Sequence, residues 1–128
     1  YCGEFPMDHN PWLDSLFASI DGMDAERFAA HLAPDALFQF GNAPAVRGTA
    51  EIVAAVGGFF HAIAGVGHRL LGHWTCGETT ICHGLVTYRR LDGGTVTVPF
   101  ANVMTLDGEK AREYRIFADL SPLFAAAA

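Results

Sequence analysis

The sequence is poor in positive charge and has no long apolar run. Only eight of its 128 residues are Lys or Arg, they form no cluster, and the formal net charge is -6. Proteins that bind nucleic acid or anionic membrane surfaces usually carry a basic patch, so we expect neither partner. No apolar segment approaches the roughly 20 residues that span a bilayer, and the first ten residues lack the basic start and apolar stretch of a signal peptide. A membrane partner is therefore not expected.

Cysteine and metal-binding patterns are equally sparse. Cys2, Cys76 and Cys82 are an odd number of cysteines without the spacing of a disulfide scaffold. Cys76 and Cys82 flank a turn and can face each other across a hairpin, but reduced thiols in a cytoplasmic protein are the favoured interpretation. The histidines show no HxH, HxxxH or HExxH spacing, and no glycine-rich phosphate-binding motif is present. We therefore expect no metal ion and no cofactor.

Apolar residues, by contrast, make up 51% of the chain and charged residues only 17%, which excludes a disordered protein. A length of 128 residues predicts one domain, residues 1–128. Apolar residues at helical spacing follow three capping residues, Asn10, Asp24 and Thr49, and predict three helices. Extended segments dominate the rest of the chain. Helices collected at the front predict an α+β fold in which they cover one face of a curved, mostly antiparallel sheet.

The clearest strand prediction runs from Thr95 to Leu106. Its residues alternate between an apolar face and a small or weakly polar face, which is typical of a strand with one buried side. We expect Phe100, Asn102 and Met104 to face the helices. Asn102 is the exception on the apolar face, and a buried amide needs a partner, either the backbone or a ligand.

The order of elements and several short motifs together resemble the SnoaL-like branch of the nuclear transport factor 2-like superfamily. The matching residues, spread from Asn10 to Leu123, include Asp21-Gly22-Met23-Asp24, Pro34-Asp35-Ala36, Val98-Pro99-Phe100 and Arg115-Ile116-Phe117-Ala118-Asp119. This resemblance implies a cone-shaped fold with a pocket between a concave sheet and the helices. It does not select a reaction, because the superfamily holds isomerases, polyketide cyclases, dehydratases, epoxide hydrolases and non-catalytic members.

The resemblance also points to one acid–base residue. Relatives in the epoxide hydrolase and cyclase branches place an aspartate near the end of the last long strand, and Asp119 matches that position. Phe38 and Phe40 stand where the epoxide hydrolases have a water-binding Tyr and Asn, so epoxide hydrolysis is not favoured. Phe40 also stands about where ketosteroid isomerases have their general base. Asp119 would have a raised pKa in a dry pocket, whereas an ion pair with Arg115 or Arg90, or a bond to the tail that follows, would make it structural.

Further candidates surround this residue in the expected pocket. His68, which shares strand parity with Leu70 and Trp74, can carry protons or bind a substrate oxygen, and the alternative is a half-buried structural histidine. Tyr88 and Arg90 contact a ligand if their strand face is concave. The residues expected to bind substrate are Asn102, Tyr88, Arg90, Trp12, Phe38, Phe40 and Phe60.

These residues predict an acid–base enzyme, with Asp119 and His68 as catalytic residues, that acts on a small apolar, cyclic substrate. The alternatives are a non-catalytic protein that binds a small apolar ligand, and a dimerisation module of the same fold. A homodimer is expected in either case, because the weakly polar face of the sheet suits a partner better than water.

Overall fold

The computed structural model describes residues 10–124. A six-stranded sheet has the order β2-β1-β6-β5-β4-β3, in which β1 and β6 are parallel and the other neighbours antiparallel. The elements are α1 (Pro11–Asp21), α2 (Ala25–Ala29), β1 (Leu32–Phe40), β2 (Val46–Arg47), α3 (Thr49–His61), β3 (Ile63–Cys76), β4 (Thr79–Arg90), β5 (Thr95–Asp107), β6 (Lys110–Phe117) and α4 (Ser121–Phe124).

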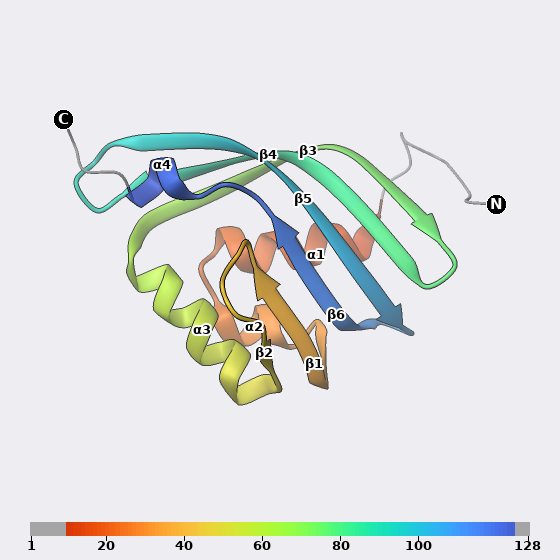
Figure 1. Ribbon diagram of the computed structural model, residues 1–128. Coiled ribbons are helices and arrows are strands. Elements are labelled where there is room, and N and C mark those ends of the chain that lie inside the picture. The colour runs from red at the N-terminus through yellow and green to blue at the C-terminus, as the bar shows by residue number, and fades with distance from the viewer. Residues whose placement is uncertain (1–9, 125–128) are drawn as a thin grey trace.

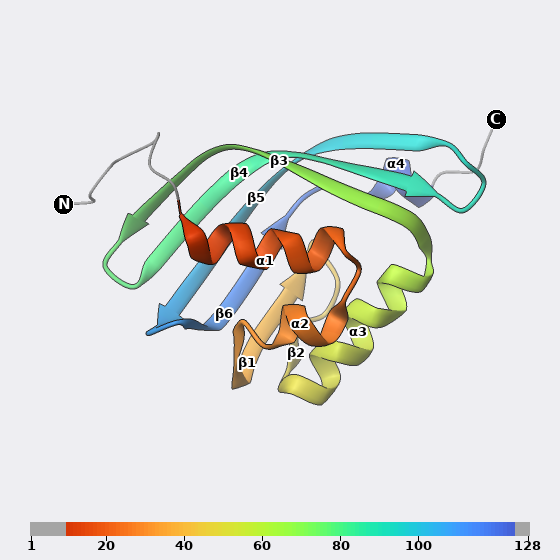
Figure 2. The same cartoon turned by 180° about the vertical axis from the view of Figure 1, so that it is seen from behind.

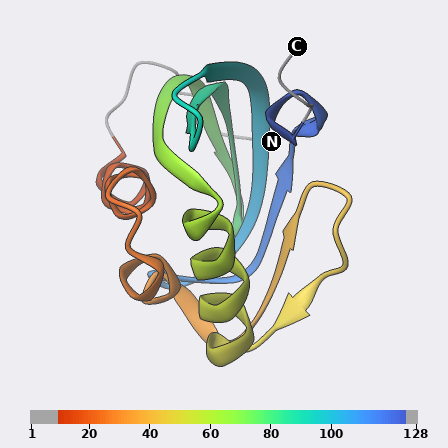
Figure 3. The same ribbon diagram turned by 90° about the vertical axis from the view of Figure 1, so that its left-hand side faces the viewer.

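The sheet is strongly curved, and its concave face holds the core. Helices α1, α2 and α3 lie against that face (Figures 1 and 2), whereas α4 follows the end of β6 at the rim of the sheet (Figure 3). This is the predicted α+β arrangement. The predicted inner face of β5 is also confirmed, because Phe100, Asn102 and Met104 are buried while Thr97 and Pro99 are exposed.

Capping side chains begin the first two helices as predicted. Asn10 accepts a hydrogen bond from the backbone N–H of Leu13, and Asp24 accepts one from that of Arg27, so each satisfies an otherwise unpaired donor. The predicted cap at Thr49 is wrong, because Gly48 is the N-cap of α3 and no side chain caps this helix. The third helix is therefore held by packing of Ile52, Val56 and Phe60 against the core.

A bulge in β3 changes which residues face the core. The register with β4 shifts between Leu70 and Gly72, so Trp74 pairs with Ile81 and stacks on His83, with ring centroids 5.5 Å apart. The expectation that His68 and Trp74 share a face is therefore wrong, since one inserted residue reverses the alternation.

The cysteines differ from the prediction in part. Cys82 is a free, buried thiol on the inner face of β4, and burial raises its pKa to about 12. Cys76 is disulfide-bonded, so the expectation of reduced thiols is wrong for this residue. Cys76 and Cys82 do not face each other, because their partners across the hairpin are Thr79 and His73. Within residues 10–124, none of the helices has the length and apolar character needed to cross a membrane.

Candidate functional site

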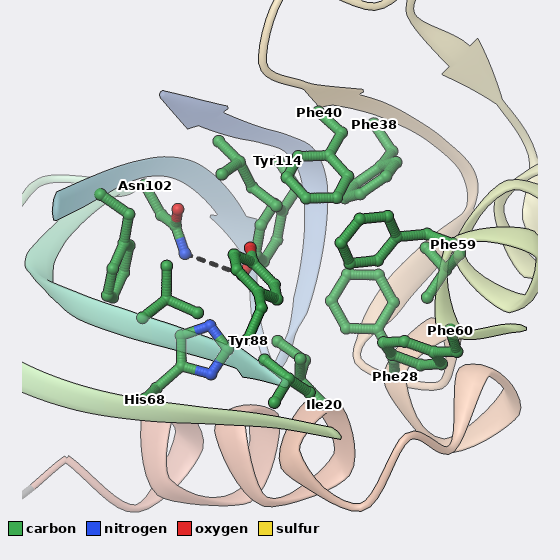
Figure 4. Close-up of a pocket in the computed structure, with 15 residues that line it drawn as sticks. Ile20, Phe28, Phe38, Phe40, Phe59, Phe60, His68, Tyr88, Asn102 and Tyr114 are labelled. Atoms are coloured by element: carbon green, nitrogen blue, oxygen red, sulfur yellow. Dashed lines mark hydrogen bonds between the residues drawn. The ribbon is translucent and has the colours of Figure 1, made fainter. Parts of the chain in front are cut away.

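A small cavity lies between the concave face of the sheet and the helices. Its volume is about 40 Å³, which is room for about three water molecules. Six phenylalanines line it: Phe28, Phe38, Phe40, Phe59, Phe60 and Phe100. The polar residues in the wall are His68, Tyr88, Asn102 and Tyr114 (Figure 4). We call this space the inner cavity.

His68 is held in the wall by a carboxylate from another element. Asp21, the last residue of α1, lies with Oδ1 2.6 Å from Nδ1 of His68, and its Oδ2 accepts the backbone N–H of His68 at 3.3 Å. A carboxylate only accepts hydrogen bonds, so Nδ1 carries a proton and Nε2 of the neutral ring is a proton acceptor. In Figure 4 one ring nitrogen faces α1 and the other faces Asn102. Nε2 is therefore the nitrogen available to the cavity.

The ring of His68 is also fixed by aromatic contacts. It packs against Phe17 on α1 and Phe100 on β5, with ring centroids 4.7 and 5.2 Å away. The side chain of His68 is 10% exposed and that of Asp21 is 36% exposed. The pair thus joins the inner cavity to the surface, where a proton can exchange with water.

Asn102 presents a polar atom to the same cavity. Its Nδ2 donates to the hydroxyl of Tyr114 over 3.0 Å, whereas its Oδ1 has no hydrogen-bond partner among the described residues. The residue is only 2% exposed. An unpaired buried oxygen is costly, so a ligand or water that donates to Oδ1 stabilises the site. Asn102 thus lines the inner cavity, and its predicted contact with a substrate stays a prediction.

Tyr88 supplies a neutral phenol. It is buried on the inner face of β4, and burial raises its pKa to about 12. The hydroxyl therefore keeps its proton at neutral pH and can donate a hydrogen bond to a carbonyl or enolate oxygen. Its ring packs edge to face on Phe59, with centroids 5.6 Å apart.

Asp119 does not lie in the inner cavity. Strand β6 ends at Phe117, and Asp119 is exposed, with Oδ1 accepting hydrogen bonds from the backbone N–H and the hydroxyl of Ser121. These bonds lower the pKa of Asp119, as in the alternative in which the carboxylate binds the tail that follows rather than lining a dry pocket. The expected arginine partners bond elsewhere, Arg115 to Gln39 and Arg90 to Asp92. The carboxylate thus binds the first residue of α4.

Of the other residues predicted to bind substrate, some line the inner cavity and others lie outside it. Phe38, Phe40 and Phe60 line the inner cavity. Arg90 lies outside it, where its guanidinium pairs with Asp92 and donates to the carbonyl of Pro122. Trp12 also lies outside, and its indole N–H donates to the carbonyl of Glu109.

Three residues of the site, Asp21, Tyr114 and Phe59, were not predicted as functional. Asp21 carried a usable signal, because a carboxylate in the last turn of a helix faces the negative end of the helix dipole. Such a residue is unfavourable unless a partner stabilises it, and here that partner is His68. The hydroxyl of Tyr114 carried no sequence signal, since its position follows from the pairing of β5 with β6.

The arrangement is suited to moving protons. His68, whose Nε2 is a proton acceptor, lines one apolar space together with the neutral donor Tyr88 and with Asn102, whose Oδ1 is unpaired among the described residues. Among residues 10–124, no group of three or more His, Cys, Asp and Glu side chains is arranged to hold a metal ion.

Comparisons with known proteins agree with this fold. A hypothetical protein with a ketosteroid isomerase-like fold from Catenulispora acidiphila, in complex with trimethylamine, is similar with a TM-score of 0.82 at 14% identity, and 89% of each chain is covered. A protein described as a SnoaL-like polyketide cyclase from Jannaschia sp. CCS1 has a TM-score of 0.72 at 17% identity, with 92% of this chain and 94% of that chain covered. An LEH-like epoxide hydrolase from M. tuberculosis has a TM-score of 0.73 at 12% identity, with 88% and 84% covered.

Identities this low show the shared fold alone. No curated protein sequence matches the chain significantly. The model of the SnoaL-like domain family, however, matches residues 13–114, which is most of the sequence. The protein therefore belongs to the SnoaL-like domain family, within a fold whose members include polyketide cyclases and epoxide hydrolases.

Proposed function

We propose that the protein is an acid–base enzyme of the isomerase or cyclase type that acts on a small apolar, cyclic carbonyl compound. The observation that carries this proposal is the Asp21–His68 pair, which leaves Nε2 of His68 as a proton acceptor at an apolar cavity. His68 takes the catalytic role that the sequence had shared between His68 and Asp119. Asp21 is a positioning residue, because it acts through the ring of His68.

In the proposed reaction, Nε2 of His68 removes a proton from the carbon next to the carbonyl group. The electron pair of that C–H bond forms the C=C bond of an enolate, and the carbonyl oxygen gains the negative charge. Tyr88 donates a hydrogen bond to this oxygen. In a substrate with a C=C bond at the β,γ position the enolate is a dienolate, and the imidazolium returns the proton to its γ-carbon. The C=C bond then lies between the α- and β-carbons, which completes an isomerisation. In a cyclase, the enolate carbon attacks a second carbonyl group instead, and the new alkoxide takes up the proton.

Exchange of an activated C–H proton tests this step without the natural substrate. We expect the wild-type protein to accelerate the exchange of the α-protons of 2-tetralone in D₂O, followed by proton NMR. His68→Gln should lower the protein-dependent rate by about a hundredfold or more, because positioned acid–base groups contribute about 10²–10⁴-fold. Asp21→Asn should lower it by about tenfold and change its pH profile, because the ring loses the partner that fixes its tautomer.

His83→Gln is the matched control. His83 stacks on Trp74, and it follows Cys82 on β4, so its ring lies on the opposite face of the sheet from the inner cavity. This variant should exchange protons at the wild-type rate. Equal rates in wild type and a folded His68→Gln variant would show that His68 is not the base.

A second candidate function is the binding of an apolar ligand without chemistry. The aromatic wall of the inner cavity favours it. A wild-type protein that binds 2-tetralone but leaves its exchange rate at the level of buffer would support this alternative.

A further inference from the structure

The inner cavity has a neighbour on the surface with which it shares two aromatic rings. This outer groove has a volume of about 600 Å³, and its lining includes Phe40, Phe59, Asp119, Leu120, Ser121 and Phe124. Phe40 and Phe59 line both spaces. Their rings meet edge to face with centroids 4.8 Å apart. The two spaces are therefore separated by this pair of side chains.

Phe59 is placed between residues of both spaces. Besides Phe40, its ring contacts Tyr88 of the inner cavity at 5.6 Å and Phe124 of the outer groove at 6.5 Å. Phe124 is 61% exposed, so its ring is accessible to a ligand in the groove. The Phe59 ring therefore lies at the boundary between the inner cavity and the groove.

The volumes indicate why a connection between the two spaces is needed. About 40 Å³ accommodates a single polar group of a ligand, whereas about 600 Å³ accommodates a ring system. The groove is apolar over Phe40, Phe59, Leu120 and Phe124, and it carries the carboxylate of Asp119. A lowered pKa keeps that carboxylate charged at neutral pH, so it can accept a hydrogen bond from a ligand.

The backbone before Phe59 is unusually easy to deform. Gly57 and Gly58 lie inside α3, and glycine weakens a helix interior. Packing does not require either glycine: a Cβ at Gly58 would have no neighbour within 4 Å, and one at Gly57 would meet only the Cβ of Ala25, at 3.9 Å. The helix is therefore weakened next to Phe59 without a gain in packing.

We propose that Phe59 is a gate between the two spaces. The ligand is a flat, elongated apolar molecule whose oxygen-bearing end enters the inner cavity while its ring system lies in the outer groove. The oxygen-bearing end rests on the function proposed above, whereas the gate and the outer groove do not.

Stopped-flow fluorescence with 2-naphthol tests the gate on the whole chain. This probe has one hydroxyl group on a flat apolar body and resembles the enolate form of 2-tetralone. We expect Phe59→Ala to raise the association rate constant by about tenfold, because the ring no longer has to move. Gly58→Ala should lower it by about fivefold, because alanine strengthens the helix that must yield. Phe59→Leu gives an intermediate rate and serves if Phe59→Ala does not fold.

The outer groove is tested by a matched pair of exposed phenylalanines. Phe124→Ala should weaken 2-naphthol binding by about fivefold, because the ligand loses an apolar contact. Phe117→Ala, at a side chain that is 54% exposed and does not line the groove, should leave binding unchanged. Three results would each overturn the proposal. They are wild-type association rates in the variants of Phe59 and Gly58, equal affinities of Phe124→Ala and Phe117→Ala for 2-naphthol, and no saturable binding of 2-naphthol.

A comparison with naphthalene separates this proposal from the proposed function. Tighter binding of 2-naphthol than of naphthalene, lost in His68→Gln, supports the role of His68. If that loss occurs while the association rate constant is the same in wild type and in the variants of Phe59, the gate is wrong and the proposed function stands. If the association rate constant changes in the variants of Phe59 while His68→Gln keeps the preference for 2-naphthol, the gate stands and the proposed function fails.

Discussion

Gly58→Ala in helix α3 should stabilise the protein. Gly58 lies in the interior of α3, and its φ is not in the positive range that favours glycine. A Cβ at this position would meet no atom within 4 Å. Alanine therefore adds neither a clash nor a packing contact, and only the backbone terms change.

The size of the effect follows from helix propensity. Alanine is favoured over glycine in a helix interior by about 0.8–1 kcal/mol, mainly because glycine loses more backbone freedom on folding. We expect the free energy of unfolding to rise by about 1 kcal/mol. For a chain of 128 residues, that corresponds to an increase of about 3–5 °C in Tm.

Urea denaturation and a thermal melt, both followed by circular dichroism, measure this change. Gly22→Ala is the matched control, because Gly22 ends α1 and a Cβ there would lie 3.2 Å from the carbonyl oxygen of Ala18. This close contact should cancel any gain. A Gly58→Ala protein that is less stable than wild type would refute the reasoning and indicate that α3 needs glycine for a reason other than packing.

Two further predictions concern β4. Gly84→Ala should destabilise the protein by about 2 kcal/mol or more in urea denaturation, because its Cβ would lie 2.0 Å from the carbonyl oxygen of Arg69. A Cβ at Gly67 would meet no atom within 4 Å, so the control Gly67→Ala should have little effect from packing. Equal stabilities of the two variants would contradict the close approach at the bulge. Burial raises the pKa of Cys82 from 9.0 to about 12, so its contribution to stability is complete below pH 9 and is lost as the pH rises toward 12. Between pH 9 and 12, Cys82→Ala should therefore lose less stability than wild type in urea denaturation, and parallel losses would show that this thiol does not titrate differently in the folded state.

Local patterns predicted the parts of the fold that depend on neighbouring residues. The alternation in β5 identified its buried face, and the side chains of Asn10 and Asp24 identified two helix starts, because both signals act within a few residues. Thr49 was misassigned because a good capping residue directly followed Gly48, which takes the cap position with a φ of 93°. The homodimer expected from the outer face of the sheet stays a prediction.

Alternation fails where a strand carries a bulge. The extra residue between Leu70 and Gly72 leaves no mark in the apolar pattern, yet it moves Trp74 away from the face that His68 occupies. The local trace is glycine, since Gly84 allows the backbone of Arg69 to approach closely and Gly72 leaves room for the rings of Trp74 and His83. A glycine in a strand is, however, compatible with several explanations.

The site itself shows why pairs distant in sequence escape such patterns. Asp21 and His68 are 47 residues apart, and their contact depends on how α1 crosses the sheet and where β3 begins. Asp119 is the opposite case, because the resemblance indicated its position in the chain but not its distance from the pocket. The strand ends two residues earlier, at Phe117, and the hydroxyl and N–H of Ser121 bind the carboxylate at the surface. A carboxylate becomes an acid–base group through its surroundings. Here the buried, aromatic surroundings belong to His68, so we place the proposed chemistry on β3 rather than after β6.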